Sequence, residues 1–439
     1  MRTLAEWLRL QESVHPKSID LGLERVAQVA HTLGLTQPDY AVITVGGTNG
    51  KGSTVAHLEA LTLALGVRTG MFTSPHFIRY NERIRVAGEE VGDGELIEAF
   101  ERIEAARGSL TLTFFEYNTL AALIIFTRRE VEIALLEVGL GGRLDATNLL
   151  AADVAVLASV GFDHRDWLGD TLELIGAEKA GIFRPARPAV LGTPDMPGSV
   201  FAALQNLGTP AFVAERDFRW RVHGTSWDYE GLSVRLQGLP PSALAGAIQY
   251  RNASTALAAL EALQRSPRPA ASTVPLQGRL AALDSGTAAA ALARVRLAGR
   301  FQIVPGPIEW ILDIAHNEPA AQVLAAQLRA RPLPPHAGGT RARTFAVIGV
   351  LADKDAAAIA RALAEVVDHW IVCTLSGERG TNASELAARM ALAAGSFELA
   401  DSVERGCELA RAHARAGDRV LVCGSVHTVG PALAWLRIY

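Results

Sequence analysis

A glycine-rich stretch, Val45–Ser53 (VGGTNGKGS), follows an apolar run and precedes a segment with leucines at helical spacing. The order of strand, glycines, lysine, serine and helix is typical of a phosphate-binding loop, because backbone N–H groups and a helix N-terminus converge on one anion. Lys51 can reach the outer phosphates of a nucleotide, and the Ser53 hydroxyl can bind Mg²⁺. The usual pattern has no glycine between these two residues, whereas here Gly52 separates them. The stretch predicts a nucleotide site without naming the reaction.

Two further polar positions follow apolar runs. Glu137 ends one run, and Asp163 and His164 follow another. Carboxylates at the carboxyl ends of strands in an α/β sheet lie beside the ligand crevice. An isolated histidine is more often structural than a metal ligand, but carboxylate and imidazole together can hold a cation beside phosphate oxygens. We therefore expect Glu137 and His164 to lie near the nucleotide.

Lysine is rare in this chain. Of 42 basic residues only four are lysine, namely Lys17, Lys51, Lys179 and Lys354. An amine is compact and can be covalently modified, whereas a guanidinium is a rigid fork, so a lysine that remains in an arginine-rich chain can mark a position where arginine does not serve. Chance is the alternative explanation for any one of them.

The elements that must position these residues are apolar runs alternating with helical stretches. This alternation predicts parallel sheets covered on both faces. The runs are Ala41–Val45, Ile133–Val138, Val154–Val160, Ala189–Gly192, Trp310–Ile314, Phe345–Val350, Trp370–Thr374 and Val420–Cys423. The helical stretches include Pro319–Arg331, Asp355–Val367, Ser384–Ala394 and Val403–Ala416.

Two α/β domains are predicted, since 439 residues exceed one ordinary core. The first, residues 1–298, is a P-loop-type, mostly parallel sheet with helices on both faces. The second, residues 299–439, is a smaller Rossmann-like α/β domain. Alternating, aromatic-rich Phe212–Leu239 predicts antiparallel strands that close the first domain, and low-complexity Ser266–Ala291 predicts a loop or a poorly ordered segment.

Composition excludes several classes of protein. The chain is 49% hydrophobic and 20% charged with a net charge of −4, which argues against disorder and against a nucleic-acid partner. No apolar run reaches the length of a membrane span, and the N-terminus lacks a signal-peptide core. The three cysteines form no CxxC pair. We expect a soluble cytoplasmic protein with reduced thiols and no membrane contact.

Eight separated motifs, taken together, resemble one known family. They are VGGTNGKGS (45–53), TSPHF (73–77), TFFEYNT (113–119), EVGLGGRLDATN (137–148), GFDH (161–164), EKAGI (178–182), GRFQ (299–302) and DIAHN (313–317). In this order they resemble the folylpolyglutamate synthase / dihydrofolate synthase family of Mur-type amide ligases. Gly52 between Lys51 and Ser53 is that family's own form of the loop.

The resemblance implies an ATP-dependent ligase. The γ-phosphoryl group of ATP passes to the carboxylate of dihydropteroate, or of tetrahydrofolate and its glutamates, and the amino group of L-glutamate attacks the acyl phosphate. Both activities are expected in one chain, which is expected to be a monomer. The alternatives are folylpolyglutamate synthesis alone, a cell-wall Mur enzyme acting on a nucleotide-linked peptide, or a P-loop NTPase module without ligase activity.

The resemblance also implies roles for individual residues. Lys51, Lys179 and His316 are expected to be catalytic, with Lys179 carbamylated so that it becomes a carboxylate-like ligand; a surface salt bridge is the alternative for Lys179. Mg²⁺ is expected on Ser74, Glu137 and His164, and Ser53 is a further candidate for that metal. ATP is expected to contact Thr48, Asn49, Gly50, Lys51, Gly52, Ser53, Asn252, Arg300 and Asp313.

For the substrates, the pterin contacts are expected at Ser18, Ile19, Asp20, Leu21, Thr113, Phe114, Phe115, Glu116, Leu144, Asp145 and Ala146. One of the two phenylalanines is also explained as ordinary core, and Asn252 and Asp313 as helix or strand-end caps. His316 and Ser425 are expected near the incoming glutamate. Lys354 either neutralises a carboxylate of that amino acid or belongs to a solvated charge cluster.

Overall fold

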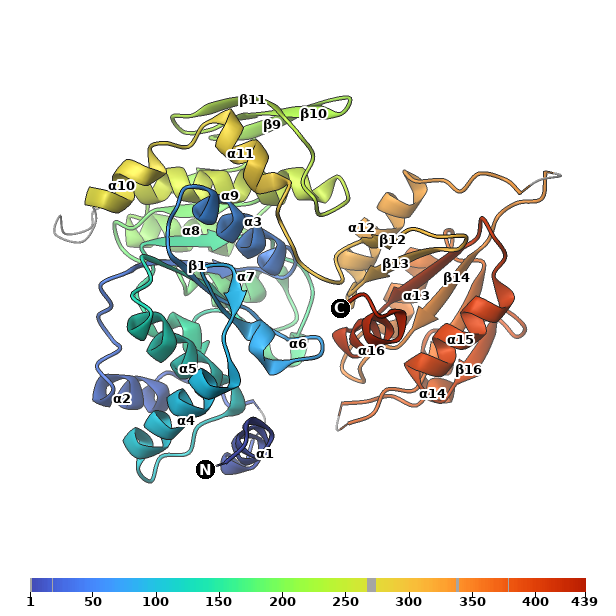
Figure 1. Ribbon diagram of the computed structural model, residues 1–439, viewed down its shortest axis with the longest axis horizontal. Helices are drawn as coiled ribbons and strands as arrows, with labels where there is room; N and C mark the ends of the chain where they lie inside the picture. Colours follow the sequence, from blue (N-terminus) through green and yellow to red (C-terminus); the bar gives the residue numbers. More distant parts are fainter. Residues whose placement is uncertain (1, 18, 267–273, 337–338, 378) are drawn as a thin grey trace. The chain divides into compact units, whose positions relative to one another are not determined.

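The computed structural model describes residues 2–17, 19–266, 274–336, 339–377 and 379–439 (Figure 1). The chain folds into two compact units. Unit 1 comprises Met1–Gly161, Trp167–Ala243 and Tyr250–Val295; unit 2 comprises Phe162–Asp166, Leu244–Gln249 and Arg296–Tyr439. No pattern in the sequence indicated the two short segments of unit 2 that precede residue 296. The predicted division at 298/299 stays a prediction.

Unit 1 is built on an eight-stranded sheet with the order β4-β3-β2-β5-β1-β6-β7-β8. Pairs β2–β5, β5–β1, β1–β6, β6–β7 and β7–β8 are parallel, whereas β3 pairs antiparallel with both β2 and β4. The mostly parallel sheet is as predicted. The strands are β1 (Ala41–Gly46), β2 (Thr69–Phe72), β3 (Ile84–Val86), β4 (Glu89–Glu90), β5 (Ile133–Glu137), β6 (Val154–Leu157), β7 (Ala189–Leu191) and β8 (Ala211–Val213).

Helices cover both faces of this sheet, because alternate strand residues point to opposite sides. Ile43 and Val45 pack in one core with α3 (Lys51–Ala64), α9 (Ile248–Gln264) and α11 (Ser285–Leu292). Val42 packs in the opposite core with α4 (Asp93–Arg107) and α5 (Phe114–Arg128), and Figure 1 shows these two groups of helices on either side of β1. The other helices of unit 1 are α1 (Leu4–Val14), α2 (Glu24–Thr32), η1 (Tyr80–Arg83), η2 (Ala146–Leu149), α6 (Arg165–Leu168, partly in unit 2), α7 (Leu172–Ala180), α8 (Gly198–Leu207) and α10 (Val274–Leu280).

A second, antiparallel sheet of three strands lies over the α9 side of unit 1. It has the order β11-β10-β9, formed by β9 (Arg219–His223), β10 (Ser226–Glu230) and β11 (Arg235–Leu239). Trp227, Tyr229 and Leu236 are buried in the same core as α3 and α9. The prediction of antiparallel strands in Phe212–Leu239 is confirmed for Arg219–Leu239, whereas Phe212 and Val213 belong to β8, which pairs in parallel with β7.

The prediction for Ser266–Ala291 is wrong for the part that the structure describes. Helix α10 covers Val274–Leu280, and α11 begins after Asp284, whose side chain accepts a hydrogen bond from Thr287 N. Ala288 and Leu292 are fully buried. Alanine-rich sequence looks featureless, but alanine has the highest helix propensity, so a capped and packed alanine stretch folds as helix. Residues 267–273 lie outside the described residues.

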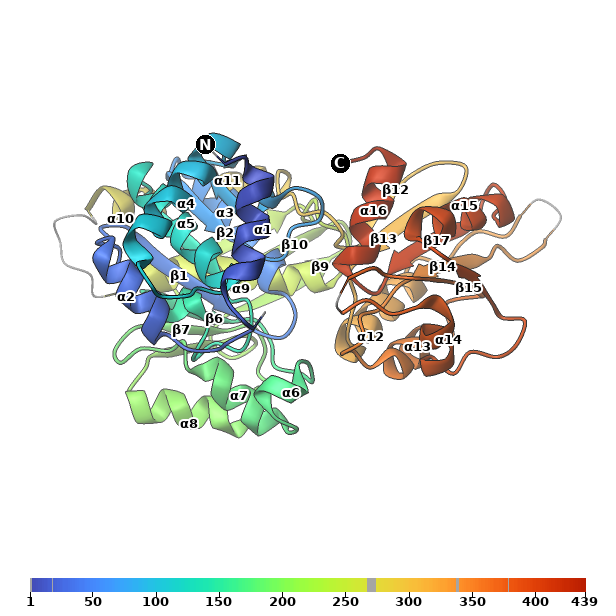
Figure 2. The ribbon, with the colours of Figure 1, turned by 90° about the horizontal axis from the view of Figure 1, so that it is seen from below.

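Unit 2 contains a six-stranded sheet with the order β12-β13-β17-β14-β15-β16. All pairs are parallel except the edge pair β12–β13. Helices α12, α13 and α14 cover one face and α15 and α16 the other (Figure 2), which confirms the predicted α/β architecture. The elements are β12 (Gln302–Val304), β13 (Glu309–Asp313), α12 (Glu318–Arg329), β14 (Thr344–Ile348), α13 (Ala356–Leu363), β15 (His369–Cys373), α14 (Ala383–Arg389), β16 (Phe397–Ala400), α15 (Val403–His413), β17 (Arg419–Cys423) and α16 (Val426–Leu436).

All three cysteines are buried and free. Among the helices that the structure describes, none has the length and apolar character needed to cross a membrane.

Candidate active site

The glycine-rich loop connects the end of β1 to the start of α3, as the sequence predicted. Gly50 is the residue before α3 and has φ 89°, a left-handed conformation that favours glycine. A Cβ added there would lie 3.1 Å from Asn252 Oδ1. The loop is tied to the chain after β6, because Thr48 Oγ1 donates to Gly161 O and accepts from Gly161 N, both at 3.0 Å. The backbone is thus held in a fixed shape before any ligand arrives.

Two of the four lysines meet at this loop. Lys51 Nζ donates to Gly47 O at 3.0 Å and to Thr48 O at 3.3 Å. Lys179, on α7, is 4% exposed, and its Nζ donates to the same Gly47 oxygen at 3.3 Å. The structure therefore brings Lys179 to the phosphate loop, which the alternative of a surface salt bridge does not explain.

Glu137 ends β5 directly beside the loop, because β5 pairs in parallel with β1 and Glu137 is in register with Val45. Its side chain is buried, and Oε2 accepts a hydrogen bond from Ser74 N at 3.1 Å. The hydroxyl-bearing Ser53 is also buried, in the first turn of α3. Carboxylate and hydroxyl oxygens are ligands that Mg²⁺ prefers, and Glu137, Ser74 and Ser53 carry such oxygens.

No group of three or more His, Cys, Asp or Glu side chains is arranged for metal binding within the ranges that the structure describes. The expected metal set of Ser74, Glu137 and His164 contains only two residues of those types. Glu137 and Ser74 lie together in unit 1, whereas the contacts of His164 described next lie in unit 2.

Unit 2 holds a buried charge cluster around Asp163. Its Oδ1 accepts from Lys354 Nζ at 2.6 Å, and its Oδ2 accepts from Asn317 Nδ2 at 2.9 Å and lies 3.3 Å from His316 Nε2. Lys354 Nζ also lies 3.3 Å from His164 Nε2. Burial alone would raise the pKa of Asp163, but hydrogen bonding and charge from His316, with His164 and Lys354, hold that pKa far below its usual value.

This cluster decides between the two interpretations of Lys354 and adds Asn317 to the candidate site. Lys354 is 8% exposed, so the interpretation as a solvated charge cluster is wrong. His164 has φ 50°, unusual for a residue with a side chain, immediately after the aspartate at the centre of the cluster. The added residue is Asn317, which the sequence analysis did not single out because an asparagine before a helix is ordinarily a cap. It does cap α12, since its Oδ1 accepts from Ala320 N, but its Nδ2 also contacts Asp163.

Two of the three segments expected to bind the pterin are joined by polar contacts in unit 1. Asp20 Oδ2 accepts from Arg25 Nη1 at 2.6 Å, and Arg25 Nη2 lies 3.3 Å from Glu116 Oε1. Glu116 in turn caps α5 together with Thr113. Arg25, which was not among the predicted contact residues, thus joins the two predicted segments. Ile19 and Leu21 are half-buried beside Asp20, and Ser18 lies outside the described residues.

The two phenylalanines at the start of α5 have different neighbours. Phe115 packs on Phe72 with ring centroids 5.7 Å apart, which fits the core explanation for one of the pair. Phe114 is half-buried and lies under the guanidinium of Arg83, 5.4 Å from its carbon to the ring centroid. Arg83 is a second residue that sequence reasoning missed, since a charged residue directly after Glu82 looks like part of an exposed polar turn.

Asp145 is already engaged by the protein. Its Oδ2 accepts from Leu140 N at 2.8 Å, and its Oδ1 accepts from Thr147 N and Oγ1 at 3.0 and 2.6 Å. Burial raises the pKa of this carboxyl, although these hydrogen bonds act in the opposite direction. Asp145 therefore caps the turn at η2, with Leu144 half-buried and Ala146 buried on either side.

In unit 2, Asp313 lies at the carboxyl end of β13. It accepts from Phe301 N and Ala315 N, both at 2.8 Å, so its oxygens cap the strand end, and this fixes Arg300 close by. Burial raises the pKa of Asp313, while the charge of Arg300 lowers it. Ser425 is buried and caps α16 by accepting from His427 N at 3.1 Å.

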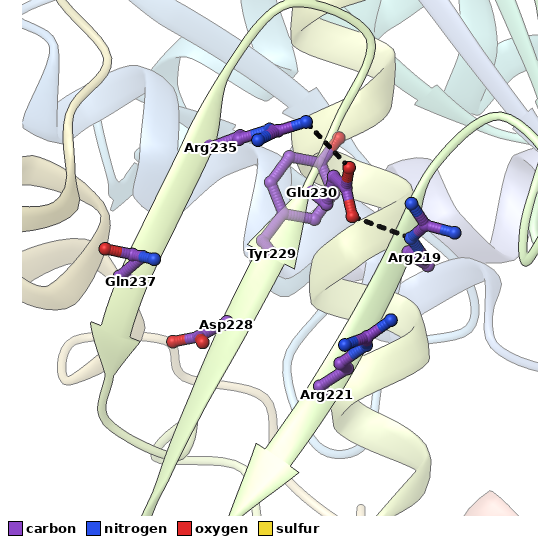
Figure 3. A pocket seen from close by; sticks show the side chains of 7 residues that line it. All are labelled: Arg219, Arg221, Asp228, Tyr229, Glu230, Arg235 and Gln237. Atoms are coloured by element: carbon purple, nitrogen blue, oxygen red, sulfur yellow. Dashed lines mark hydrogen bonds and ion pairs between the residues drawn. The ribbon is translucent and has the colours of Figure 1, made fainter.

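A pocket elsewhere in unit 1 contains none of the predicted site residues. It lies on the three-stranded sheet, where Glu230 joins Arg219 and Arg235 (Figure 3). The basic side chains of this surface are thus partly neutralised by their neighbours, and the phosphate loop has the better arrangement for an anionic ligand.

Comparison with known proteins agrees with this geometry. Residues 299–426 match the model of the Mur ligase, glutamate ligase domain. The dihydrofolate synthase/folylpolyglutamate synthase of Escherichia coli (strain K12) is 43% identical over 428 residues, covering 97% of this chain and 94% of that protein.

Two solved structures are similar over the whole chain. E. coli FolC in complex with DHPP and ADP has a TM-score of 0.89 and 41% identity, covering 99% of this chain and 98% of that chain. A bifunctional folylpolyglutamate synthase/dihydrofolate synthase crystallised with Mn, AMPPNP and L-glutamate has a TM-score of 0.88 and 39% identity, covering 100% and 99%. The chain therefore belongs to the dihydrofolate synthase/folylpolyglutamate synthase family, which comprises ATP-dependent, Mur-type ligases.

Proposed function

We propose that this chain joins L-glutamate to dihydropteroate, and also to tetrahydrofolate and its glutamates, at the expense of ATP. The main support is the arrangement at the phosphate loop: Lys51 and Lys179 converge on Gly47 O, and the buried carboxylate of Glu137 lies beside them. This site concentrates groups that handle phosphate charge, while the neighbouring network of Asp20, Arg25 and Glu116 supplies polar partners for a heterocycle.

The reaction has two steps. A carboxylate oxygen of the acceptor attacks the γ-phosphorus of ATP, and the bond to ADP breaks. The amino group of glutamate then attacks the carbonyl carbon, the bond to the phosphate oxygen breaks, and the nitrogen loses a proton as the amide forms. Such chemistry needs positioning and charge neutralisation more than a protein nucleophile. Lys51 and the N–H groups of Thr48–Ser53 hold the phosphates, and Asn252, Arg300 and Asp313 complete the nucleotide contacts.

Ser74, Glu137 and His164 would hold Mg²⁺, with Ser53 as a further oxygen donor. When bound, the metal neutralises charge on the phosphate oxygens. Glu137 is buried, and its Oε2 accepts a hydrogen bond from Ser74 N, so two of these residues already lie together.

Lys179 is proposed to act as a carbamate. The ammonium first loses one proton. The resulting amine adds to the carbon of CO₂ and releases a second proton, which leaves an N-carboxylate in place of the ammonium. Two ammonium groups on one carbonyl oxygen repel each other, and carbamylation of Lys179 removes that repulsion while adding a metal-binding oxygen. Arginine does not undergo this chemistry.

The incoming glutamate is proposed to bind at unit 2. His316 and Ser425 are the candidate contacts, and Lys354 can meet a carboxylate of the amino acid if that group competes with Asp163. We further propose that the protein works as a monomer in the cytoplasm.

The test is a product assay. The protein is incubated with Mg²⁺, ATP, L-glutamate and either dihydropteroate or tetrahydrofolate, and the products are identified by mass. Both acceptors are expected to gain glutamate, with ADP formed in equal amount, and heavy oxygen placed in the acceptor carboxylate is expected to appear in the released phosphate. Lys51→Ala serves as the inactive control.

Each alternative gives a different result. Product from tetrahydrofolate alone indicates folylpolyglutamate synthesis only, and product from a UDP-linked peptide indicates a cell-wall enzyme. ATP hydrolysis that does not depend on glutamate, without any ligated product, indicates an NTPase module and contradicts the proposal.

A further inference from the structure

Arg251 lies near the N-terminus of α9, next to Asn252, and faces the phosphate loop. A Cβ added to Gly50 would lie 3.5 Å from Arg251 Nη2, so the guanidinium of half-buried Arg251 reaches the residue immediately before α3. The two helices α3 and α9 share one core, which fixes this approach. Arg251 is therefore positioned by the fold at the same point as the nucleotide-binding backbone.

The structure shows no counter-charge for the Arg251 guanidinium among the residues that it describes. Across the described residues the guanidinium takes part in no ion pair and no side-chain hydrogen bond; the residue's backbone oxygen accepts from Thr255 Oγ1 at 2.8 Å. Burial lowers the pKa of Arg251, and no nearby carboxylate acts against this. By contrast, Arg25 and Arg187, two other arginines of unit 1, both have acidic partners.

An uncompensated, partly buried cation is unfavourable unless something pairs with it. At this place the first N–H groups of α3 also point outward and attract an anion. A planar guanidinium suits phosphate because it can form two parallel hydrogen bonds. Phosphate is thus the ligand that suits the Arg251 guanidinium, the N-terminus of α3 and the glycine-rich loop alike.

We propose that Arg251 is a further nucleotide-binding residue, whose guanidinium pairs with a phosphate of ADP or ATP. The inference rests on the proposed function, which places the nucleotide at this loop. It adds a second fixed cation to Lys51, one that neither the phosphate-loop pattern nor the family motifs single out.

The test measures ADP affinity by isothermal titration calorimetry, with Mg²⁺, for the wild type, Arg251→Gln and Arg251→Lys. Loss of one charge-assisted hydrogen bond is expected to weaken binding by about 10- to 100-fold in Arg251→Gln, with Arg251→Lys between the two. The dependence of affinity on KCl is expected to be shallower in Arg251→Gln, because one charge pair is missing. Arg221→Gln, an exposed residue of β9, is the control for the same change in net charge and is expected to bind like the wild type.

Thermal unfolding of the ligand-free proteins separates binding from a structural role. Removing an uncompensated cation is expected to leave the Tm of ligand-free Arg251→Gln equal or higher, while the Tm increase on adding ADP becomes smaller. Three results would each overturn the inference. The first is an unchanged ADP affinity in Arg251→Gln. The second is a weaker affinity with an unchanged salt dependence, as stacking on the base would give, and the third is a lower ligand-free Tm that Arg251→Lys restores. Failure of the wild type to bind ADP would instead refute the proposed function, and this inference with it.

Discussion

His57 predicts a specific acid sensitivity of unit 1. It lies on α3, one turn after Ser53, and is fully buried. Its Nδ1 lies 2.7 Å from Ser53 O and its Nε2 lies 2.9 Å from Ser242 Oγ. Because a carbonyl oxygen only accepts, Nδ1 carries the proton, and in the neutral ring Nε2 accepts from the Ser242 hydroxyl. The neutral ring thus ties the phosphate-loop helix to the chain that follows β11.

Burial lowers the pKa of His57 from 6.5 to about 4, although the hydrogen bond to Ser53 acts in the opposite direction. Between these two values the unfolded chain binds a proton that the folded chain does not, so stability rises with pH and is lost on acidification. Each pH unit in this window costs about 1.4 kcal/mol. The loss attributable to His57 is about 2 kcal/mol at about pH 5, and about 3 kcal/mol once the pH is below both pKa values.

The assay is urea denaturation at about pH 7 and about pH 5, with the wild type, His57→Gln and His31→Gln, whose histidine is exposed on α2. His57→Gln is expected to be less stable at both pH values, but its loss between them should be about 2 kcal/mol smaller than that of the wild type. His31→Gln should lose as much as the wild type. Equal losses in His57→Gln and the wild type would refute the assignment of a buried neutral imidazole.

Three further predictions concern the loop, the buried lysine and a buried carboxylate. Gly50→Ala is expected to destabilise the protein by about 1–2 kcal/mol, because φ 89° is costly for alanine. It is also expected to abolish measurable ADP binding by displacing the loop from Asn252. Normal ADP binding by calorimetry would contradict the conformational argument. Lys179→Ala is expected to reduce the ligation rate by about 10- to 100-fold, as loss of a metal-supporting group does. Adding a short carboxylic acid is expected to restore part of the rate. Full activity of Lys179→Ala in the rate assay would exclude a catalytic role for carbamylated Lys179. Glu261, which is 1% exposed, accepts hydrogen bonds from Tyr229 OH and from the chain between β10 and β11. Glu261→Gln is therefore expected to lower the free energy of unfolding, measured by urea denaturation, by about 3 kcal/mol. A loss no larger than that of a surface substitution would show that these contacts contribute little.

Local pattern was enough to predict the elements that carry the site. The apolar run before Gly46 is a buried strand, the glycines before Lys51 form the turn, and Glu137 ends a neighbouring strand, as their order along the chain indicated. These features are readable because strand, turn and helix are set mainly by residues close in sequence. The ordered motifs further indicated the family, which the similarity to known proteins confirms.

The alanine-rich segment shows where local pattern was insufficient. Its composition fits both a loop and a helix, and the burial of Ala288 and Leu292 against α3 decided for helix α11. Packing of an apolar face supplies most of the stability of a short helix, so its formation depends on a partner far away in the sequence.

The convergence of side chains was decided by tertiary structure alone. Lys179 meets Gly47 across 132 positions of the chain, Lys354 meets Asp163 across 191, and Arg251 reaches Gly50 only because α9 and α3 share a core. Nothing in the residues around Arg251 indicates that its charge lacks a partner. The sequence by itself determined which chemical groups are available and on which elements they lie. The packing of those elements determined which groups meet and which charge is left for a ligand. Such contacts depend on distances between segments that no local pattern encodes.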